Sequence, residues 1–460
     1  MHLKLFRRYW QLPLVMLWLG EAAALVLAGV LAQRVEGSTP GGIYSPASAV
    51  LFCVCVLLSM IGMGLFSRRL RERTAGIVVR LTFSVVLGGV AAGSMLVLLP
   101  WERWSLRTLL IAMVLAWLAL LVVWLIRRSI VDEEKFKRRV LAFGAGKNAR
   151  RITELRRRAD RRGFKLVGYV RVEGEETLVP HGKIVATGES LREYVKEHEV
   201  DEIVVAMDDR RRNFPLKELL NCRLDGVEIS ELVSFLEREA GKVYLDVLNP
   251  SWIIFSDGFR RDRTRQFSER CFDLFASLVV LAVSTPVMLL TALAIKIEDG
   301  LRAPVFYSQA RVGMGGQLFN VLKFRSMRID AESDGKARWA QADDNRITRV
   351  GGLIRKMRID ELPQILNVFK GDMSFVGPRP ERPEFVSELT EQIPYYGERH
   401  SVKPGITGWA QLCYPYGSSV QDAVEKLQYD LFYVKNHNLV FDMLILLQTL
   451  EVIVMGKGAR

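Results

Sequence analysis

Long apolar stretches dominate the first third of the chain. Four of them, at roughly 10–33, 46–66, 76–99 and 105–126, have the length of about 20 residues that a helix needs to cross a bilayer. Basic residues cluster before the first stretch, between the second and third, and after the fourth, whereas the other two connections hold few. The positive-inside rule therefore predicts a four-span membrane bundle over residues 1–130, with both of its ends in the cytoplasm.

The pattern changes to short apolar runs between residues 135 and 255. A helix-like segment, FPLKELLNC, separates two of these runs, as expected for a doubly wound, Rossmann-like α/β domain in the cytoplasm. The strand-like runs lie within 137–151 and at 164–170, 200–207 and 225–232.

A glycine turn follows the first predicted strand of this region. Gly144, Gly146 and Ala149 have the G-x-G-x-x-A spacing of a nucleotide-binding turn. The second strand ends at Arg171, where a dinucleotide site needs an acidic residue for the ribose, and Glu173 lies beyond it. The pattern favours a regulatory or dimer-forming domain with a vestigial turn over a nucleotide site, and both interpretations stay open. We expect a homodimer formed through this domain or the bundle.

A further apolar segment, 271–297, is long enough to cross a membrane but holds Pro286 near its middle. Proline removes a helical hydrogen bond, so a kink is expected there, and the Thr285 hydroxyl can cap carbonyls at the bend. Basic residues lie on both sides of the segment, which favours a re-entrant hairpin that enters and leaves on the cytoplasmic face. A kinked full span is the alternative.

The chain carries 64 Lys and Arg residues against 51 Asp and Glu, a net charge of +13. This balance suits nucleic acid, anionic lipid or phosphorylated substrates, and the apolar spans favour membrane lipid and phosphates, so we expect no nucleic-acid partner. The cysteines and histidines show no zinc-ligand spacing, whereas magnesium bound by carboxylate and phosphate oxygens fits the composition.

The residues that can carry out chemistry lie after residue 300. They belong to a region over 265–460 that we expect to be mostly α-helical and catalytic. RIDELPQ contains the adjacent carboxylates Asp360 and Glu361, which can supply a nucleophile or base and a magnesium ligand. We expect Asp360 to cap a short helix that ends at Gly371, because a positive helix end keeps a carboxylate ionised. A cap without catalytic function is the alternative.

Two motifs with basic residues accompany the carboxylates. The sequence GPRP holds Arg379 between two prolines, a rigid setting for a guanidinium that binds phosphate. Lys323 and Arg325, in KFRSM, form a cationic pair that can face a diphosphate. A surface turn and a solvated strand are the alternatives for these two motifs.

Residues 265–460 resemble the bacterial sugar transferases of the monotopic phosphoglycosyl transferase superfamily. The resemblance rests on the broken segment with Thr285 and Pro286, on KFRSM, RIDELPQ and GDMSFVGPRP, and on VKPGITGWAQ at 402–411. The four spans and the α/β domain resemble the large, polyprenyl-phosphate hexose-1-phosphate transferase branch.

The resemblance implies transfer of a sugar 1-phosphate from a UDP-sugar to undecaprenyl phosphate with release of UMP, at the inner membrane of a bacterium. Such a step starts the assembly of exopolysaccharide or another surface glycan. UDP-glucose, UDP-galactose and UDP-N-acetylhexosamines all remain candidate donors.

The resemblance also implies roles for individual residues. Asp360 matches the family nucleophile, which forms a phosphosugar-aspartyl intermediate, and Glu361 matches its partner, with Mg²⁺ bound at this pair. Arg355 and Arg379 match cationic positions that hold phosphate or nucleotide. Thr285 stands where serine is common, and Met357 and Arg358 replace small hydroxyl residues.

Two other functional classes fit parts of the chain. A membrane-anchored nucleotide-sugar dehydratase or epimerase would need a Tyr-x-x-x-Lys pair, and no tyrosine here has a lysine four residues later. A non-catalytic scaffold for polysaccharide assembly would not require Asp360.

Overall fold

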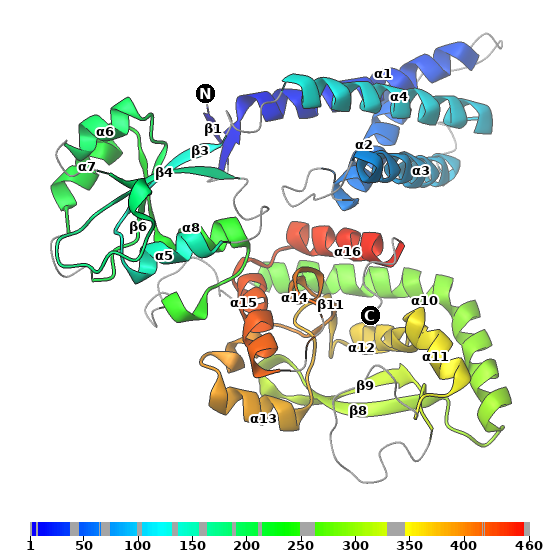
Figure 1. Cartoon of the computed structure of the whole chain (residues 1–460). Coiled ribbons are helices and arrows are strands. Elements are labelled where there is room, and N and C mark those ends of the chain that lie inside the picture. The colour runs from blue at the N-terminus through cyan, green and yellow to red at the C-terminus, as the bar shows by residue number, and fades with distance from the viewer. Residues whose placement is uncertain are drawn as a thin grey trace. The chain divides into compact units, whose positions relative to one another are not determined.

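The protein is described by a computed structural model in which contacts divide the chain into two units, Met1–Ala240 and Gly241–Arg460 (Figure 1). Each unit is considered by itself. The described residues are 2–5, 8–36, 46–63, 65, 74–98, 104–130, 137–155, 163–185, 190–209, 214–248, 263–328, 346–415, 417 and 419–454.

The four predicted N-terminal helices are all present: α1 (Leu12–Glu36), α2 (Pro46–Gly62), α3 (Thr74–Leu98) and α4 (Leu106–Ile130). By length and composition α1, α3 and α4 can each cross a membrane, and α2 is a shorter apolar helix of 17 residues. The basic residues between α2 and α3, in 66–73, and Lys135 after α4 lie outside the described part of the chain.

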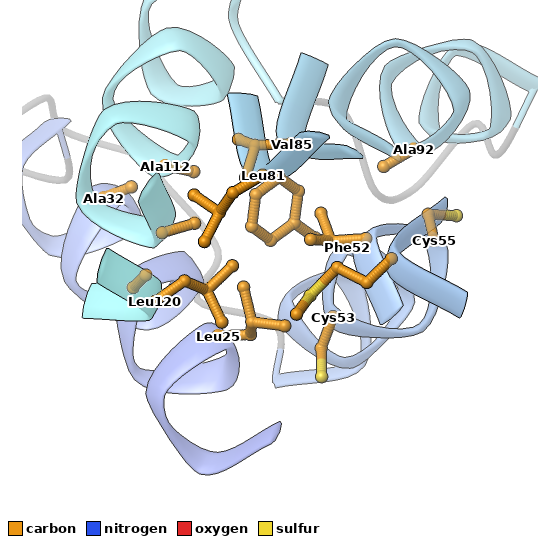
Figure 2. Close-up of a cluster of buried hydrophobic side chains, with 14 residues drawn as sticks. Leu25, Ala32, Phe52, Cys53, Cys55, Leu81, Val85, Ala92, Ala112 and Leu120 are labelled. Atoms are coloured by element: carbon orange, nitrogen blue, oxygen red, sulfur yellow. The ribbon is translucent and has the colours of Figure 1, made fainter. Parts of the chain in front are cut away.

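The bundle buries apolar side chains between its helices and presents others outward. Figure 2 shows Leu25, Phe52, Leu81 and Leu120, from four different helices, gathered in one core. Outward positions such as Val97 are apolar as well. A helix that is apolar on all sides needs an apolar surrounding, which supports a membrane location.

The α/β region forms a parallel sheet of five strands in the order β5-β4-β3-β6-β7. Counted along the region this is 3-2-1-4-5, an order typical of doubly wound nucleotide-binding folds. The bounds of the strands and helices are β3 (Arg138–Phe143), α5 (Lys147–Glu154), β4 (Phe164–Val170), β5 (Ile184–Val185), α6 (Leu191–Glu197), β6 (Glu202–Val205), α7 (Leu216–Leu224), β7 (Glu228–Glu231) and α8 (Leu232–Ala240).

The second unit is built on α10 (Arg263–Asp299), a 37-residue apolar helix with Pro286 inside it. The helix bends along its length in Figure 1. The Thr285 hydroxyl donates a hydrogen bond of 2.6 Å to the carbonyl of Leu281. That carbonyl precedes the one that Pro286 deprives of its amide partner, so the predicted capping is displaced by one residue.

Shorter helices and strands follow α10 and carry the sequence motifs KFRSM, RIDELPQ and GPRP on or between them. An antiparallel hairpin joins β8 (Phe306–Val312) to β9 (Leu318–Phe324), and β10 (Ser374–Val376) pairs in parallel with β11 (Gly405–Thr407). The helices are α11 (Arg349–Lys356), α12 (Gln364–Lys370), α13 (Pro383–Gln392), α14 (Trp409–Cys413), α15 (Val420–Asn436) and α16 (Leu439–Val454).

Residues 241–248 belong to the second unit, although we predicted that the α/β domain extends to residue 255. Val243 and Leu248 pack in a core cluster with Leu389 of α13. Trp409 Nε1 donates a hydrogen bond of 2.8 Å to the carbonyl of Gly241. The predicted domain limits near 255 and 265 lie next to or within residues 249–262, which are not described.

Small residues allow α2 and α3 to approach closely. A Cβ added at Gly88 would lie 2.5 Å from the Cα of Val56, whereas one added at Gly20 of α1 would meet no atom within 4 Å. We predict that Gly88→Ala destabilises the bundle by about 1–3 kcal/mol through overpacking, while Gly20→Ala does not. Melting temperatures of the two variants in detergent test this, and equal values would contradict the packing of α2 on α3.

Candidate active site

The two adjacent carboxylates lie in a tight 3-10 turn, Ile359–Glu361, between α11 and α12. The prediction that Asp360 caps the following helix is wrong, because α12 begins only at Gln364. Pro363 has no amide hydrogen for the carbonyl of Ile359, and the amide of Leu362 donates to that carbonyl instead. The helix does end at Gly371, whose φ of 104° is left-handed, as expected.

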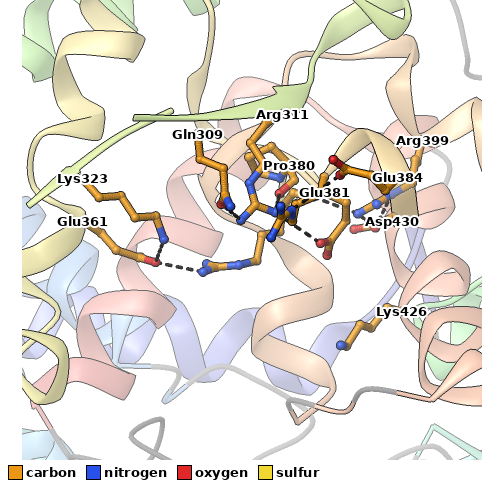
Figure 3. A network of polar contacts seen from close by, with 12 residues as sticks. Gln309, Arg311, Lys323, Glu361, Pro380, Glu381, Glu384, Arg399, Lys426 and Asp430 are labelled. Carbon is orange, nitrogen blue, oxygen red and sulfur yellow. Dashed lines mark hydrogen bonds and ion pairs between the residues drawn. The ribbon is translucent and has the colours of Figure 1, made fainter. Parts of the chain in front are cut away.

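Glu361 is held by two cations from distant parts of the sequence. Its Oε1 accepts a hydrogen bond of 3.2 Å from Lys323 Nζ at the end of β9 and one of 2.8 Å from Arg379 Nη2 in the GPRP loop. Figure 3 shows the Lys323 and Glu361 side chains pointing toward one another. The side chain of Glu361 is 13% exposed, so this oxygen is shared by two cations in a largely desolvated place.

The electrostatics of Glu361 and Lys323 follow from this contact. Burial alone would raise the pKa of Glu361, but the charges of Arg379 and Lys323 and their hydrogen bonds outweigh burial and hold its pKa well below the usual range. Burial lowers the pKa of Lys323, and Arg379 lowers it further, against the opposing charge of Glu361. Glu361 is therefore ionised at neutral pH.

Asp360 differs from its neighbour. Burial, followed by the adjacent charge of Glu361, raises the pKa of Asp360 above its ordinary value, while Lys323, Arg355 and Arg379 oppose the rise. The expected contribution of a helix N-terminus is missing because Asp360 precedes α12 by a full turn. Among the described residues, no hydrogen bond or ion pair engages the Asp360 carboxylate.

Arg325 does not lie with Lys323 at the carboxylate pair, although the two were predicted to act together as a cationic pair. Its buried guanidinium donates a hydrogen bond of 2.6 Å from Nη2 to Asp299 at the end of α10. Lys323 and Arg325 therefore serve different carboxylates. The structure brings together Lys323, Arg379, Asp360 and Glu361, and Arg355 contributes through its charge.

The carboxylates fit magnesium bound together with substrate phosphate. Hydrogen bonds and ion pairs within the described residues reach only one of the four oxygens of this pair, Glu361 Oε1. The same part of the chain contains no cluster of three or more histidine, cysteine or acidic side chains that could hold a metal alone. Magnesium commonly uses one or two carboxylates and completes its shell with phosphate and water.

A buried ion pair behind the GPRP loop was not predicted from the sequence. Arg399 donates hydrogen bonds to Asp430 Oδ2 from Nε at 3.1 Å and from Nη2 at 2.8 Å, and both side chains are buried. The two residues lie 31 positions apart, so no local motif joins them. A signal was available in α15, where Asp430 shares a helix face with apolar residues, three positions after Leu427 and four before Val434.

In the α/β region, the glycine turn lies between β3 and α5, as predicted. Gly144 has a left-handed φ of 123°, and a Cβ there would lie 2.5 Å from the carbonyl oxygen of Ala206, so only glycine fits. Ala149 is buried in α5. Carboxylates of the same chain, from Asp208 and Glu175, accept hydrogen bonds from the amides of the turn.

Two family models match the chain. The model of the bacterial sugar transferase family matches residues 264–456, and that of a CoA-binding domain matches residues 62–220. The first therefore covers the unit that contains the carboxylate pair, and the second covers part of the bundle and most of the α/β region.

Three curated relatives illustrate the similarity. An undecaprenyl-phosphate glucose phosphotransferase of Komagataeibacter xylinus is 30% identical over 82% of this chain and 71% of its own length. A UDP-galactose-lipid carrier transferase of Erwinia amylovora is 29% identical over 95% and 94%. A UDP-N-acetylgalactosamine-undecaprenyl-phosphate N-acetylgalactosaminephosphotransferase of Aeromonas hydrophila is 40% identical over 53% of this chain, which spans 56% of that relative.

The depressed pKa of Glu361 predicts a pH-dependent stability. The ion pairs contribute stability above the ordinary glutamate pKa of about 4.3, and this contribution is lost as the pH falls through the lower pKa of the folded protein. At pH 7 we expect Glu361→Gln to cost about 1–3 kcal/mol, because two partly buried cations lose their acceptor. Melting curves from pH 7 to 3 should show the deficit shrinking with acid; a deficit independent of pH would contradict the ion pairs.

Proposed function

Because the chain belongs to the bacterial sugar transferase family, we propose that it transfers a sugar 1-phosphate from a UDP-sugar to undecaprenyl phosphate and releases UMP. The observation that carries the proposal is the adjacent carboxylate pair, in which Lys323 and Arg379 hold Glu361 beside Asp360. The names of the three relatives specify different sugars, namely N-acetylgalactosamine, glucose and galactose. We expect the donor of this chain to be one of the corresponding UDP-sugars.

Asp360 acts as the nucleophile in this proposal. Its carboxylate oxygen attacks the phosphorus that bears the sugar, the bond from that phosphorus to the bridging oxygen breaks, and UMP leaves with that oxygen. An oxygen of undecaprenyl phosphate then attacks the same phosphorus and displaces the Asp360 carboxylate. Two bulky anionic substrates thus need not occupy the site together. The absence of a described ion pair at Asp360 supports an available nucleophile.

The other site residues stabilise the charges of the substrate and of Asp360. Glu361 stays ionised and orients Lys323 and Arg379, whose cations then stabilise phosphate oxygens as negative charge moves to UMP. Arg355 adds positive charge beside Asp360 and lowers its pKa, which opposes the effect of burial. Magnesium bound by Asp360 and Glu361 would neutralise the diphosphate of the donor.

The membrane arrangement of α10 extends the proposal. A re-entrant α10 keeps both of its ends on the cytoplasmic side of the inner membrane, where UDP-sugars are found, and brings the site to the lipid substrate. The bend of α10 and the interior Pro286 support this arrangement (Figure 1). The outward apolar side chains of this helix, among them Phe275 and Leu290, suit contact with acyl chains.

We predict that Asp360→Asn lowers UMP release from a UDP-sugar by at least about 10³-fold, since the amide cannot attack, and that Glu361→Gln lowers it by about 10²-fold. Membrane fractions are assayed with a panel of UDP-sugars and undecaprenyl phosphate. Glu384→Gln, which changes an exposed carboxylate near the start of α13, serves as the matched control and keeps the parent rate. Full activity of both Asp360→Asn and Glu361→Gln would contradict the mechanism.

For the re-entrant arrangement, we predict that a tag fused to the C-terminus is cleaved by protease in inverted membrane vesicles and protected in spheroplasts. A tag at the N-terminus should behave identically, because four spans return the chain to its starting side. Opposite behaviour of the two tags would show that α10 crosses the membrane.

A further inference from the structure

The GPRP loop, Gly377–Pro380, is held through its backbone carbonyls. The carbonyl of Pro378 accepts a hydrogen bond of 3.0 Å from the amide of Gly405, and that of Arg379 accepts one of 3.0 Å from Arg399 Nη2. Arg311 Nη1 donates to the carbonyl of Pro380 at 3.3 Å. Three successive carbonyls of the loop are therefore bonded to three other segments of the chain.

Arg399 is more buried than Arg311, the other guanidinium donor, and its other contacts fix its position. Besides its two bonds to Asp430, its Nη1 donates to the Tyr396 hydroxyl at 3.0 Å. Asp430 is 2% exposed and Arg399 5%. Burial of such a pair costs desolvation energy that its attraction barely recovers, so the pair contributes little net stability compared with apolar residues.

We infer that Arg399 is a positioning residue that, through its bond to the Arg379 carbonyl, fixes the backbone from which the Arg379 guanidinium reaches Glu361. Asp430 in turn orients Arg399 (Figure 3). The flanking prolines narrow the backbone angles open to Arg379, and the bond from Arg399 then fixes the orientation of its carbonyl. The inference rests on the proposed function, because it assigns Arg399 to the binding of phosphate by Arg379.

A double-mutant cycle on UMP release tests this inference. Arg399→Lys keeps a positive charge beside Asp430, but a lysine cannot make the planar set of bonds that reaches both Asp430 and the Arg379 carbonyl. We expect this change to lower kcat/KM by about tenfold in the parent and by less than about twofold in the Arg379→Ala background, which lacks the guanidinium that Arg399 positions. Glu384→Gln, the exposed control of the UMP-release assay, should leave kcat/KM unchanged in both backgrounds.

The outcomes are distinct. Equal losses from Arg399→Lys in the two backgrounds, with normal turnover by the parent, would show a general structural role and overturn the inference alone. Full activity of Arg399→Lys in the parent would also overturn it. If the parent releases UMP from no UDP-sugar, the proposed function fails, and the inference fails with it.

An independent observation concerns the glycine turn of the α/β unit, whose family model is that of a CoA-binding domain. Asp208 accepts hydrogen bonds from the amides of Lys147 at 2.9 Å and Asn148 at 2.7 Å, the first amides of α5. Glu175 accepts from the amide of Ala145 at 3.3 Å and from that of Asp208 at 2.7 Å. The amides of Ala145, Lys147 and Asn148 are the donors that a bound diphosphate would use in such a turn.

The geometry points to a turn that is closed by the chain's own carboxylates and takes no CoA or dinucleotide phosphate. Asp208 lies so close that a Cβ added at Gly146 would be 2.1 Å from its Oδ2. Two carboxylates at this place also repel phosphate, and Arg171 stands where a ribose-binding acid would be needed.

Thermal unfolding of the full chain in detergent tests this second inference. Millimolar CoA should not change the melting temperature of the parent. Sulfate should stabilise Asp208→Ala more than the parent, because the amides of α5 then accept an external anion, and Asp225→Ala, which removes an exposed carboxylate paired with Arg192, should respond like the parent. Saturable stabilisation of the parent by CoA, or equal responses of all three proteins to sulfate, would overturn the inference.

Discussion

One shared acceptor, Oε1 of Glu361, organises the catalytic unit. It joins the end of β9, the 3-10 turn of the carboxylate pair and the GPRP loop, which are far apart in the sequence, through Lys323 and Arg379. Because the site is largely desolvated, the two cations keep Glu361 ionised despite burial. The same burial, with the charge of Glu361, raises the pKa of Asp360, so neighbouring carboxylates acquire different electrostatic characters.

A second set of contacts fixes the backbone of the GPRP loop rather than the charge of the site. Each carbonyl from Pro378 to Pro380 is bonded to a separate segment, and Arg399 is itself held by Asp430. The arrangement presents the Arg379 guanidinium from a fixed loop. A rigid cationic site of this kind suits the binding and stabilisation of phosphate groups.

Much of the architecture was predictable from local patterns. The apolar runs gave the four helices, strand β4 was predicted at its observed bounds, and Gly144 and Gly371 have the backbone angles that their motifs require. The start of α12 was wrong because Pro363 changes the local hydrogen bonds. The partners of Arg325, Arg399 and the glycine turn were not predictable, since Asp299, Asp430 and Asp208 meet them only through tertiary packing.

The most direct test of the account is the state of Asp360 when donor is present and the lipid acceptor is absent. The parent protein is incubated with a UDP-sugar that supports turnover, quenched and analysed by mass spectrometry of the intact chain and its peptides. The account predicts a sugar-phosphate adduct on the peptide that contains Asp360, which disappears when undecaprenyl phosphate is added. Normal turnover without any adduct at that side chain would contradict it.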